Sequence, residues 1–576
     1  MKSLLKRWLA LGLAGMCPLA GMAQSGQHLA VPQPGGMPGS PVMEGISRLT
    51  NGVKLSWDGP AGAYQVFQTP RLTSPWAAWG LATNQQRTAT LPPAASNAFF
   101  RVSGPAPKYA GSAICIDCHL DVCRYETNTA HARAYADPRF QAAGGQTNAT
   151  CLACHTVGYG VMANGKPAGF VSAAATPQLE GVQCENCHGP AANHAASEDD
   201  PIVRPRVEIA ATLCGGCHTA SHTACPAPPT YEEWASSGHA AVTPDALQVM
   251  AAATNNITSC GVCHSGSARL ALINGQNPAA TVANDYDVAL ACAVCHDPHA
   301  TNQLAPAQLR NPLFSTNDFH LTSAAVASVS AFTSQYNAGT NINLCAQCHN
   351  DRGAAWTDSA RAPHHSLQYN MLIATVGELA PFYPAYIASH AGLPGSASVS
   401  IAGTFYLTNQ CAACHLQPDA AGGANHSFVV VTNVCLNCHS ADSVPALPLT
   451  AFSPDFSNQI ATTIASLNQW SATKAPAGLK TNGAVAWEYP DADGLNWQVN
   501  PSGRITGWTQ ASLTATNFNG PSAAGQSALT NYPGILKARF DLYLVLNDGS
   551  HGAHNYLYSL FLLDSAQYFV QQELNK

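Results

Sequence analysis

The pattern Cys-x-x-Cys-His occurs nine times between residues 115 and 439. These motifs contain 18 of the 21 cysteines, and a histidine follows every pair although only 22 of the 576 residues are histidine. Disulfides or zinc sites would not require a histidine at that one position. The pattern therefore predicts c-type haem, with two thiols bonded to the macrocycle and the histidine as the proximal ligand of its iron.

We number the motifs 1 to 9 in chain order, and the haem predicted on each carries the same number. The expected cofactor content is nine covalently bound haem c groups. The predicted thioether cysteines are Cys115, Cys118, Cys151, Cys154, Cys184, Cys187, Cys214, Cys217, Cys260, Cys263, Cys292, Cys295, Cys345, Cys348, Cys411, Cys414, Cys435 and Cys438. The predicted proximal histidines are His119, His155, His188, His218, His264, His296, His349, His415 and His439.

The ligand at the sixth position of each iron decides between electron transfer and catalysis. Beyond the N-terminal region only Met162, Met250 and Met371 remain, so methionine cannot be the general sixth ligand. Thirteen histidines lie outside the motifs, and nine irons each need one. We therefore expect mostly bis-histidine haems.

His194 and His299 follow their own motif histidines closely, six and three residues further along the chain. Three residues are too short a tether to reach the opposite face of the same macrocycle. Gly189 and Pro190 favour a turn after the other motif. Each of these two histidines is therefore expected to ligate a neighbouring haem.

The nine motifs span 325 residues, or about 36 residues per haem. With so little protein, the haems themselves must supply much of the apolar interior. The fold class predicted is a multihaem cytochrome c, haem-packed and loop-rich with short helices, which follows a small N-terminal all-β sandwich-like domain. Close packing of haems favours electron conduction.

The ends of the chain differ from this middle part. Residues 1–23 are typical of an export signal peptide cleaved after Ala23, with lipid attachment at Cys17 as an alternative. Residues 24–45 are expected to be a linker, and residues 46–105 alternate in the manner of short strands. Residues 446–576 are predicted to form a haem-free C-terminal module, with tryptophans among polar loops and a final helix near 555–574.

Charge excludes one class of partner. The chain has 25 basic and 32 acidic residues, a formal net charge of -7, and no basic run, so we expect no nucleic-acid binding. No later segment is long and apolar enough to cross a membrane. Cys123 and Cys225 are left over from the haem motifs and are a possible disulfide pair in an oxidising compartment.

Several motifs resemble the multihaem cytochrome c family. They include YAGSAICIDCH with TAHARAY, GVQCENCHGPAANH, YEEWASSGHA, CAVCHDPH, LCAQCHN with RAPHHSLQ, and ANHSF before CLNCH. That family includes the tetrahaem cytochrome of nitrification, octahaem tetrathionate reductase-like and hydroxylamine oxidoreductase-like proteins, and extracellular electron-transfer cytochromes. The resemblance covers residues 108–440 and implies a nonahaem domain over 106–445. Residues 46–105 resemble a fibronectin type III-like domain.

The resemblance also implies distal ligands. His222 and His365 are substitutes beside stronger candidates. The family pattern places the distal ligands at His131, His194, His239, His299, His364 and His426. The C-terminal segment, which resembles the closing segment of such proteins, adds His554. His320 and His390 complete the nine candidates. Two features of relatives are missing: no motif ends in lysine, as in pentahaem nitrite reductases, and no tyrosine is identifiable as a haem cross-link.

These observations predict an exported protein of the periplasm, outer surface or extracellular space. It would conduct electrons to partner cytochromes or extracellular acceptors, with filament assembly through His28 or His551 as a special case. One alternative is a multihaem oxidoreductase that acts on a small nitrogen or sulfur compound at one open haem. Another is a surface binding protein that uses its N-terminal domain.

Overall fold

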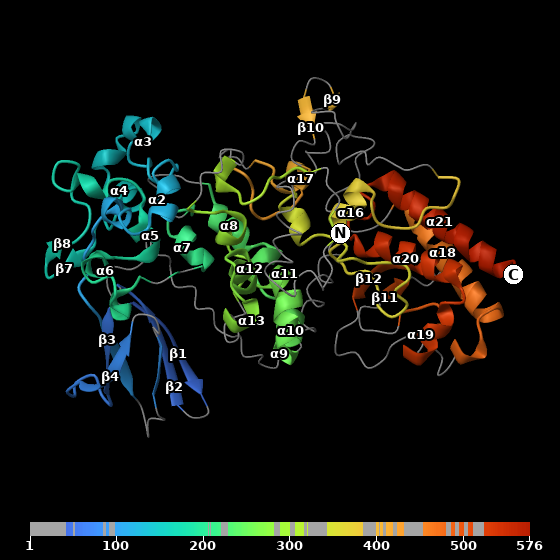
Figure 1. Cartoon of the computed structure of the whole chain (residues 1–576), viewed down its shortest axis with the longest axis horizontal. Coiled ribbons are helices and arrows are strands. Elements are labelled where there is room, and N and C mark those ends of the chain that lie inside the picture. Colours follow the sequence, from blue (N-terminus) through green and yellow to red (C-terminus); the bar gives the residue numbers. More distant parts are fainter. Residues whose placement is uncertain are drawn as a thin grey trace, which may run out of the picture.

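The computed structural model describes most of the chain between residues 42 and 576. Residues outside the description are 1–41, 50–51, 61, 84–87, 92–97, 206, 208, 221–227, 282–287, 300–305, 316–318, 321–341, 384–398, 402–403, 407–409, 419–422, 431–452, 480–484, 490–494, 500–504 and 511–522. Figure 1 shows an elongated molecule in which the chain runs from an N-terminal β module, through short helices and loops, to long C-terminal helices.

Two antiparallel three-stranded sheets form the N-terminal β module, in the orders β1-β2-β5 and β4-β3-β6. The side chains of Leu55, Trp57, Tyr64 and Val66 are fully buried between them, as the alternating pattern requires. The first strand begins at Val42, inside the stretch expected to be a linker. The strands are β1 (Val42–Leu49), β2 (Gly52–Asp58), β3 (Ala63–Thr69), β4 (Ala77–Thr83), β5 (Thr88–Leu91) and β6 (Phe99–Ser103).

The motif-bearing middle of the chain consists of short helices joined by loops, in agreement with the predicted loop-rich character. Small hydrophobic clusters replace a single large core here, such as the one around Tyr135, Phe140 and Phe170. The helices are α1 (Ser112–Cys115), α2 (Leu120–Glu126), α3 (Pro138–Ala142), α4 (Ala149–His155), α5 (Cys184–His188), α6 (Ala192–Ala196), α7 (Ala211–Gly215), α8 (Thr230–Ala235), α9 (Pro244–Ala252), α10 (Thr254–Asn256), α11 (Val262–His264), α12 (Gly266–Ile273), α13 (Pro278–Thr281), α14 (Cys292–Cys295), α16 (Gln368–Ile373) and α17 (Cys411–His415). The short strand pairs of this part are β7 (Met162–Ala163) with β8 (Lys166–Pro167), and β9 (Val399–Ile401) with β10 (Thr404–Tyr406).

The C-terminal module contains the largest hydrophobic core of the described residues. Most of this core is formed by three long helices: α18 (Pro454–Thr473), α20 (Pro533–Asn547) and α21 (Tyr556–Leu574). Trp470 lies in α18 with no exposed surface, so the expectation that it sits in a polar loop is wrong. The expected final helix is α21. The shorter elements are α19 (Ala523–Leu529), β11 (Leu495–Val499) and β12 (Ile505–Gln510).

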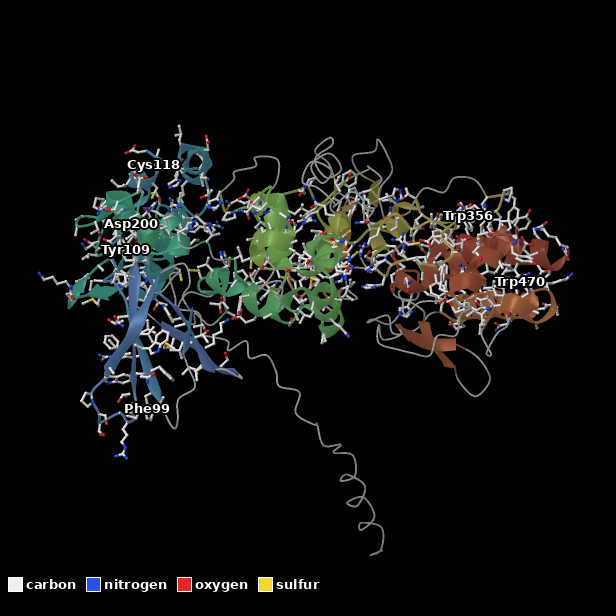
Figure 2. The ribbon with its side chains drawn as sticks, turned by 60° about the horizontal axis from the view of Figure 1, so that its bottom comes forward. Phe99, Tyr109, Cys118, Asp200, Trp356 and Trp470 are labelled. Carbon is white, nitrogen blue, oxygen red and sulfur yellow. The ribbon has the colours of Figure 1, made fainter. Side chains whose placement is uncertain are left out.

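The described haem motifs lie between the β module and the long C-terminal helices. Figure 2 shows Cys118 of motif 1 near the end that carries the β module, and Trp470 at the opposite end of the molecule. Among the described residues, no helix is both long and apolar enough to span a bilayer.

Candidate haem-binding site

Most described motifs fold as a single helical turn, which brings their three functional side chains together. The backbone N–H of the motif histidine donates to the carbonyl of the first cysteine at 2.9 Å in motifs 1, 4 and 6, and at 2.8 Å in motif 7. Because residues three and four apart share one helix face, the two thiols and the imidazole project to the same side. This is the arrangement that covalent haem c requires, with its proximal ligand close to both thioether bonds.

In seven of the eight motifs that the structure describes, a second histidine lies opposite the motif histidine, and its ring centroid is 6.0 to 6.4 Å away. The pairs are His119 with His194 (6.3 Å), His131 with His218 (6.0 Å), His188 with His299 (6.0 Å), His239 with His349 (6.2 Å), His264 with His364 (6.2 Å), His296 with His426 (6.2 Å) and His415 with His554 (6.4 Å).

This separation fits one metal ion between each pair of rings. Two metal–nitrogen bonds of about 2 Å, plus about 1.2 Å from each nitrogen to its ring centre, add up to about 6.4 Å. Imidazoles that stack directly lie closer: the rings of His364 and His365 are 4.2 Å apart. The cysteines and histidines present therefore fit covalent haem c whose irons have two histidine ligands.

The pairing connects distant parts of the sequence. His194, which follows motif 3, lies opposite His119 of motif 1. His299, which follows motif 6, lies opposite His188 of motif 3. In both cases the histidine near a motif faces a different motif, which is the arrangement that the short tethers predict.

In His239 and His264, burial favours the neutral imidazole, the form that binds a metal. Burial, with a smaller effect of His349, lowers the pKa of His239 to about 4. Burial and the neighbouring His365 lower the pKa of His264 to about 4. At neutral pH, both side chains therefore carry a nitrogen lone pair.

Hydrogen bonds at Nδ1 orient several rings and leave Nε2 for a metal. The carbonyl oxygens of Ala307 and Phe428 lie 2.7 and 2.8 Å from Nδ1 of His296 and His415. A carbonyl only accepts, so each Nδ1 must carry the proton. Partners of this kind are the usual way to fix the tautomer and orientation of a metal-binding imidazole.

His554 has a charged partner instead. Its Nδ1 lies 2.6 Å from Oδ1 of Asp548, a side chain that is only 1% exposed. Burial lowers the pKa of His554, but the charge and the hydrogen bond of Asp548 more than offset this and raise it overall. The composition of the sequence gives no signal for Asp548; the contact results from the turn between α20 and α21.

Motif 2 differs from the seven paired motifs. The ring beside His155 is Phe140, which stacks on it at 4.2 Å with an interplanar angle of 16°. Nδ1 of His155 is 2.9 Å from the carbonyl oxygen of Ala134. Among the described residues, no histidine ring stands opposite His155 in the way seen at the other motifs.

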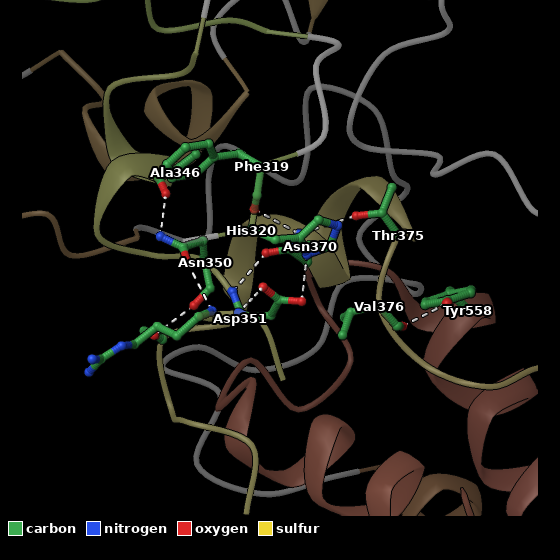
Figure 3. A network of polar contacts seen from close by, with 12 residues as sticks. Phe319, His320, Ala346, Asn350, Asp351, Asn370, Thr375, Val376 and Tyr558 are labelled. Carbon is green, nitrogen blue, oxygen red and sulfur yellow. Dashed lines mark hydrogen bonds and ion pairs between the residues drawn. The ribbon is translucent and has the colours of Figure 1, made fainter. Parts of the chain in front are cut away.

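His320 lies in a buried polar network beside motif 7 (Figure 3). Its Nδ1 is 2.6 Å from Oδ2 of Asp351, which is 2% exposed, and Asn370 contacts both residues. The structure thus orients His320 like a ligand. His390, His439, Cys435 and Cys438 lie outside the described residues, as do His28, His222 and Cys225.

His365 provides a second imidazole at motif 5. Its ring centroid is 6.4 Å from that of His264, nearly the same distance as that of His364. Nδ1 of His364 is 2.8 Å from the hydroxyl of Ser366, which in turn donates to the carbonyl of Asn350. This chain of hydrogen bonds favours His364 as the ligand and leaves His365 beside it.

Among the described motifs, cysteines of different motifs meet in four places, and each contact would bring two predicted haem edges together. The hydrogen-bonded thiol pairs are Cys115 with Cys184, Cys214 with Cys292, Cys263 with Cys348, and Cys345 with Cys411. These contacts join motif 1 to 3, 4 to 6, 5 to 7, and 7 to 8. In addition, Cys187 lies within electrostatic range of Cys214, and Cys295 within range of Cys348.

Part of the chain matches a family of known proteins. Residues 114–189, which hold motifs 1 to 3, match the family described as cytochrome c554 and c-prime. The match confirms the predicted resemblance to multihaem c-type cytochromes.

Two solved structures are also similar to this chain. The outer cell wall cytochrome OcwA is 18% identical with a TM-score of 0.46, covering 80% of this chain and 100% of that one. The undecahaem cytochrome from the S-layer of Carboxydothermus ferrireducens is 19% identical with a TM-score of 0.45, covering 81% of this chain and 70% of that one. No curated protein matches the chain.

Proposed function

We propose that this protein is an exported nonahaem c-type cytochrome that conducts electrons along a chain of mostly bis-histidine haems. The observation that carries the proposal is the set of seven opposed histidine pairs, each with the spacing of two axial ligands. An iron with two protein ligands has no open position for a substrate, which is the usual design of an electron carrier.

The contacts between motif cysteines support a continuous route. Three groups of haems would adjoin at their thioether edges: haems 1 and 3, haems 4 and 6, and haems 5, 7 and 8. The proximity of Cys187 to Cys214 and of Cys295 to Cys348 joins these groups. The proposed order is 1-3-4-6-7-8 with haem 5 as a branch at haem 7, so the route does not follow the sequence.

The proposed partners are other cytochromes at one end and extracellular acceptors at the other. The signal peptide predicted for residues 1–23 supports an exported location. In the filament form of the proposal, His28 or His551 of one subunit completes a terminal haem of the next. Electron microscopy of the purified protein at high concentration tests that form, and a monodisperse monomer under all conditions would contradict it.

A stopped-flow experiment tests conduction. The fully reduced protein is mixed with a large soluble acceptor that contacts only surface haems, and oxidation of all haems is followed in the Soret band. We expect the seven haems of this route to form one connected pool and to be oxidised without a residual reduced fraction. More than two haems that stay reduced while the acceptor is in excess would contradict a continuous chain.

A second candidate function rests on motif 2. If the haem attached to Cys151 and Cys154 has an open sixth position, it is the place where a small nitrogen or sulfur compound would react. Seven other motifs have a second histidine ring 6.0 to 6.4 Å from their own, whereas the ring described next to His155 is Phe140, which stacks on its face; this difference favours haem 2 over those seven. Turnover assays with nitrite, hydroxylamine and tetrathionate test this candidate, and inactivity with all three would reject the proposed substrates.

A further inference from the structure

The turn between α20 and α21 holds a carboxylate and a histidine in fixed contact. Asp548 follows α20 directly, and its N–H donates to the carbonyl of Leu544 at 3.0 Å. Gly549 has φ of 68°, a conformation that glycine adopts without strain, and reverses the chain here. The N–H of His554 donates to the hydroxyl of Ser550 at 3.1 Å, and Asn555 caps α21.

This turn meets motif 8 on one side and motif 7 on the other. The ring of His554 lies opposite that of His415, 6.4 Å away between centroids. Gln368 connects the turn to motif 7: its Nε2 donates to the carbonyl of Asp548 at 3.3 Å, and its Oε1 is 3.2 Å from Nδ1 of His349. The C-terminal module thus reaches into the motif region through one loop.

The partner of His554 differs in charge from those of several other paired histidines. His296, His415 and His426 have backbone carbonyls near Nδ1, and His364 has a hydroxyl. His299 also has a carboxylate neighbour, but that of Asp297 lies farther away, 3.8 Å from Nδ1. Asp548 presents a carboxylate at 2.6 Å, almost completely withdrawn from water. A buried negative charge acts strongly because few solvent dipoles screen it.

We propose that Asp548 is a positioning residue that fixes His554 as the distal ligand of haem 8 and lowers the reduction potential of that haem. The inference rests on the proposed function. A carboxylate hydrogen-bonded to Nδ1 makes the imidazole a stronger donor, and its charge stabilises the ferric state. The consequence is that electron transfer from haem 8 to haem 7 is more favourable than it would be with a neutral partner.

Potentiometric titration of the purified holoprotein at fixed pH, followed by visible and EPR spectroscopy, tests the proposal. Asp548→Asn keeps the shape and a hydrogen-bond acceptor but removes the charge. We expect one haem component to move to higher potential while haem content and carbon monoxide binding stay unchanged. Asp548→Glu restores the charge and should move that component back toward the wild-type value.

Two further variants make the result decisive. Asp358→Asn removes a half-buried carboxylate that pairs with Arg361, and it should leave every potential unchanged. Ser550→Ala removes the hydroxyl that donates to Asp548, so the charge of the carboxylate acts more strongly on His554 and the same component should move to lower potential. If Asp548→Asn fails to fold, the sign of the Ser550→Ala shift decides.

Unchanged potentials in both Asp548→Asn and Ser550→Ala, with haem ligation intact, would overturn the proposal. His554→Ala separates this failure from failure of the proposed function, because it should convert one haem to a high-spin form that binds carbon monoxide. If all haems of His554→Ala stay low-spin, the ligand assignment itself is wrong.

Discussion

Removal of His239 should open one haem and leave the others unchanged. His239 lies opposite His349 of motif 7 at 6.2 Å, and its other ring neighbour is Phe428, at 4.6 Å, which has no atom that can ligate iron. In His239→Ala, haem 7 should therefore become high-spin in the ferric form and bind carbon monoxide in the ferrous form. One haem among nine motifs corresponds to about 11% of the total iron.

Motif 5 provides the matched control. His365 stands 6.4 Å from His264, so it should replace His364 when that residue is removed. We expect His364→Ala to stay fully low-spin, and the double variant His364→Ala/His365→Ala to gain one high-spin haem. His239→Ala and His364→Ala thus remove the same kind of side chain, but only His239→Ala should gain one equivalent of high-spin haem.

The assay is EPR spin quantitation of the oxidised protein, together with carbon monoxide difference spectra of the reduced protein, both referred to total haem. The reasoning is refuted if His239→Ala shows no gain of high-spin haem, or a gain of several equivalents. The first result would mean that His239 is not a ligand. The second would mean that its role is structural.

Three other predictions concern backbone fit, packing and pH. Gly181→Ala should disturb the His131 segment and produce some high-spin haem, because a Cβ at residue 181, where φ is +81°, would lie 2.3 Å from the carbonyl oxygen of Ala132. The control is Gly165→Ala, since Gly165 also has a positive φ but a Cβ there would meet open space. EPR compares the high-spin haem content of the two variants. Leu562→Ala should lower the free energy of unfolding by about 2–5 kcal/mol, because this α21 side chain is fully buried. Leu557 lies in the same helix but is 48% exposed, so Leu557→Ala should cost far less. Urea unfolding followed by circular dichroism measures both variants. Burial raises the pKa of Asp541 well above 3.8, so the folded state binds the proton of this side chain more tightly than the unfolded state does. The free energy of unfolding should therefore fall as pH rises from about 4 toward the folded-state pKa. Asp541→Asn should flatten this dependence and be more stable than wild type at neutral pH, and an unchanged slope in unfolding measurements across pH would contradict the assignment.

Local chemistry explains why the haem motifs were predictable from the sequence. Attachment needs two thiols and an imidazole on one helical turn, so the motif is complete within five consecutive residues. The distal ligands are different, because His131 and His218, or His415 and His554, meet only after the chain has folded. The sequence could supply candidates for these positions but not their pairing.

The partners behind the ligands were even less predictable. Asp548, Asp351 and Ser366 are common residue types in unremarkable surroundings, and only the folded turns bring them to Nδ1 of a histidine. Phe140 beside His155 is a similar case, since nothing in the sequence distinguishes it from a core aromatic residue.

The fold, too, was predictable from the sequence only in part. Alternation of Val53, Leu55 and Trp57 predicted the N-terminal strands, because one face of each strand is buried. Helix α20 was missed, since it is buried nearly all around and even Arg539 and Asp541 are covered, which leaves no amphipathic periodicity to read. The domain ranges proposed from the sequence remain predictions.

The measurement that tests the central claim most directly is the carbon monoxide stoichiometry of the fully reduced wild-type protein, with total haem counted by intact mass and optical absorption. The account predicts nine haems, of which at most one binds carbon monoxide, namely the haem on Cys151 and Cys154. Carbon monoxide bound to two or more haems would contradict a chain of closed bis-histidine haems.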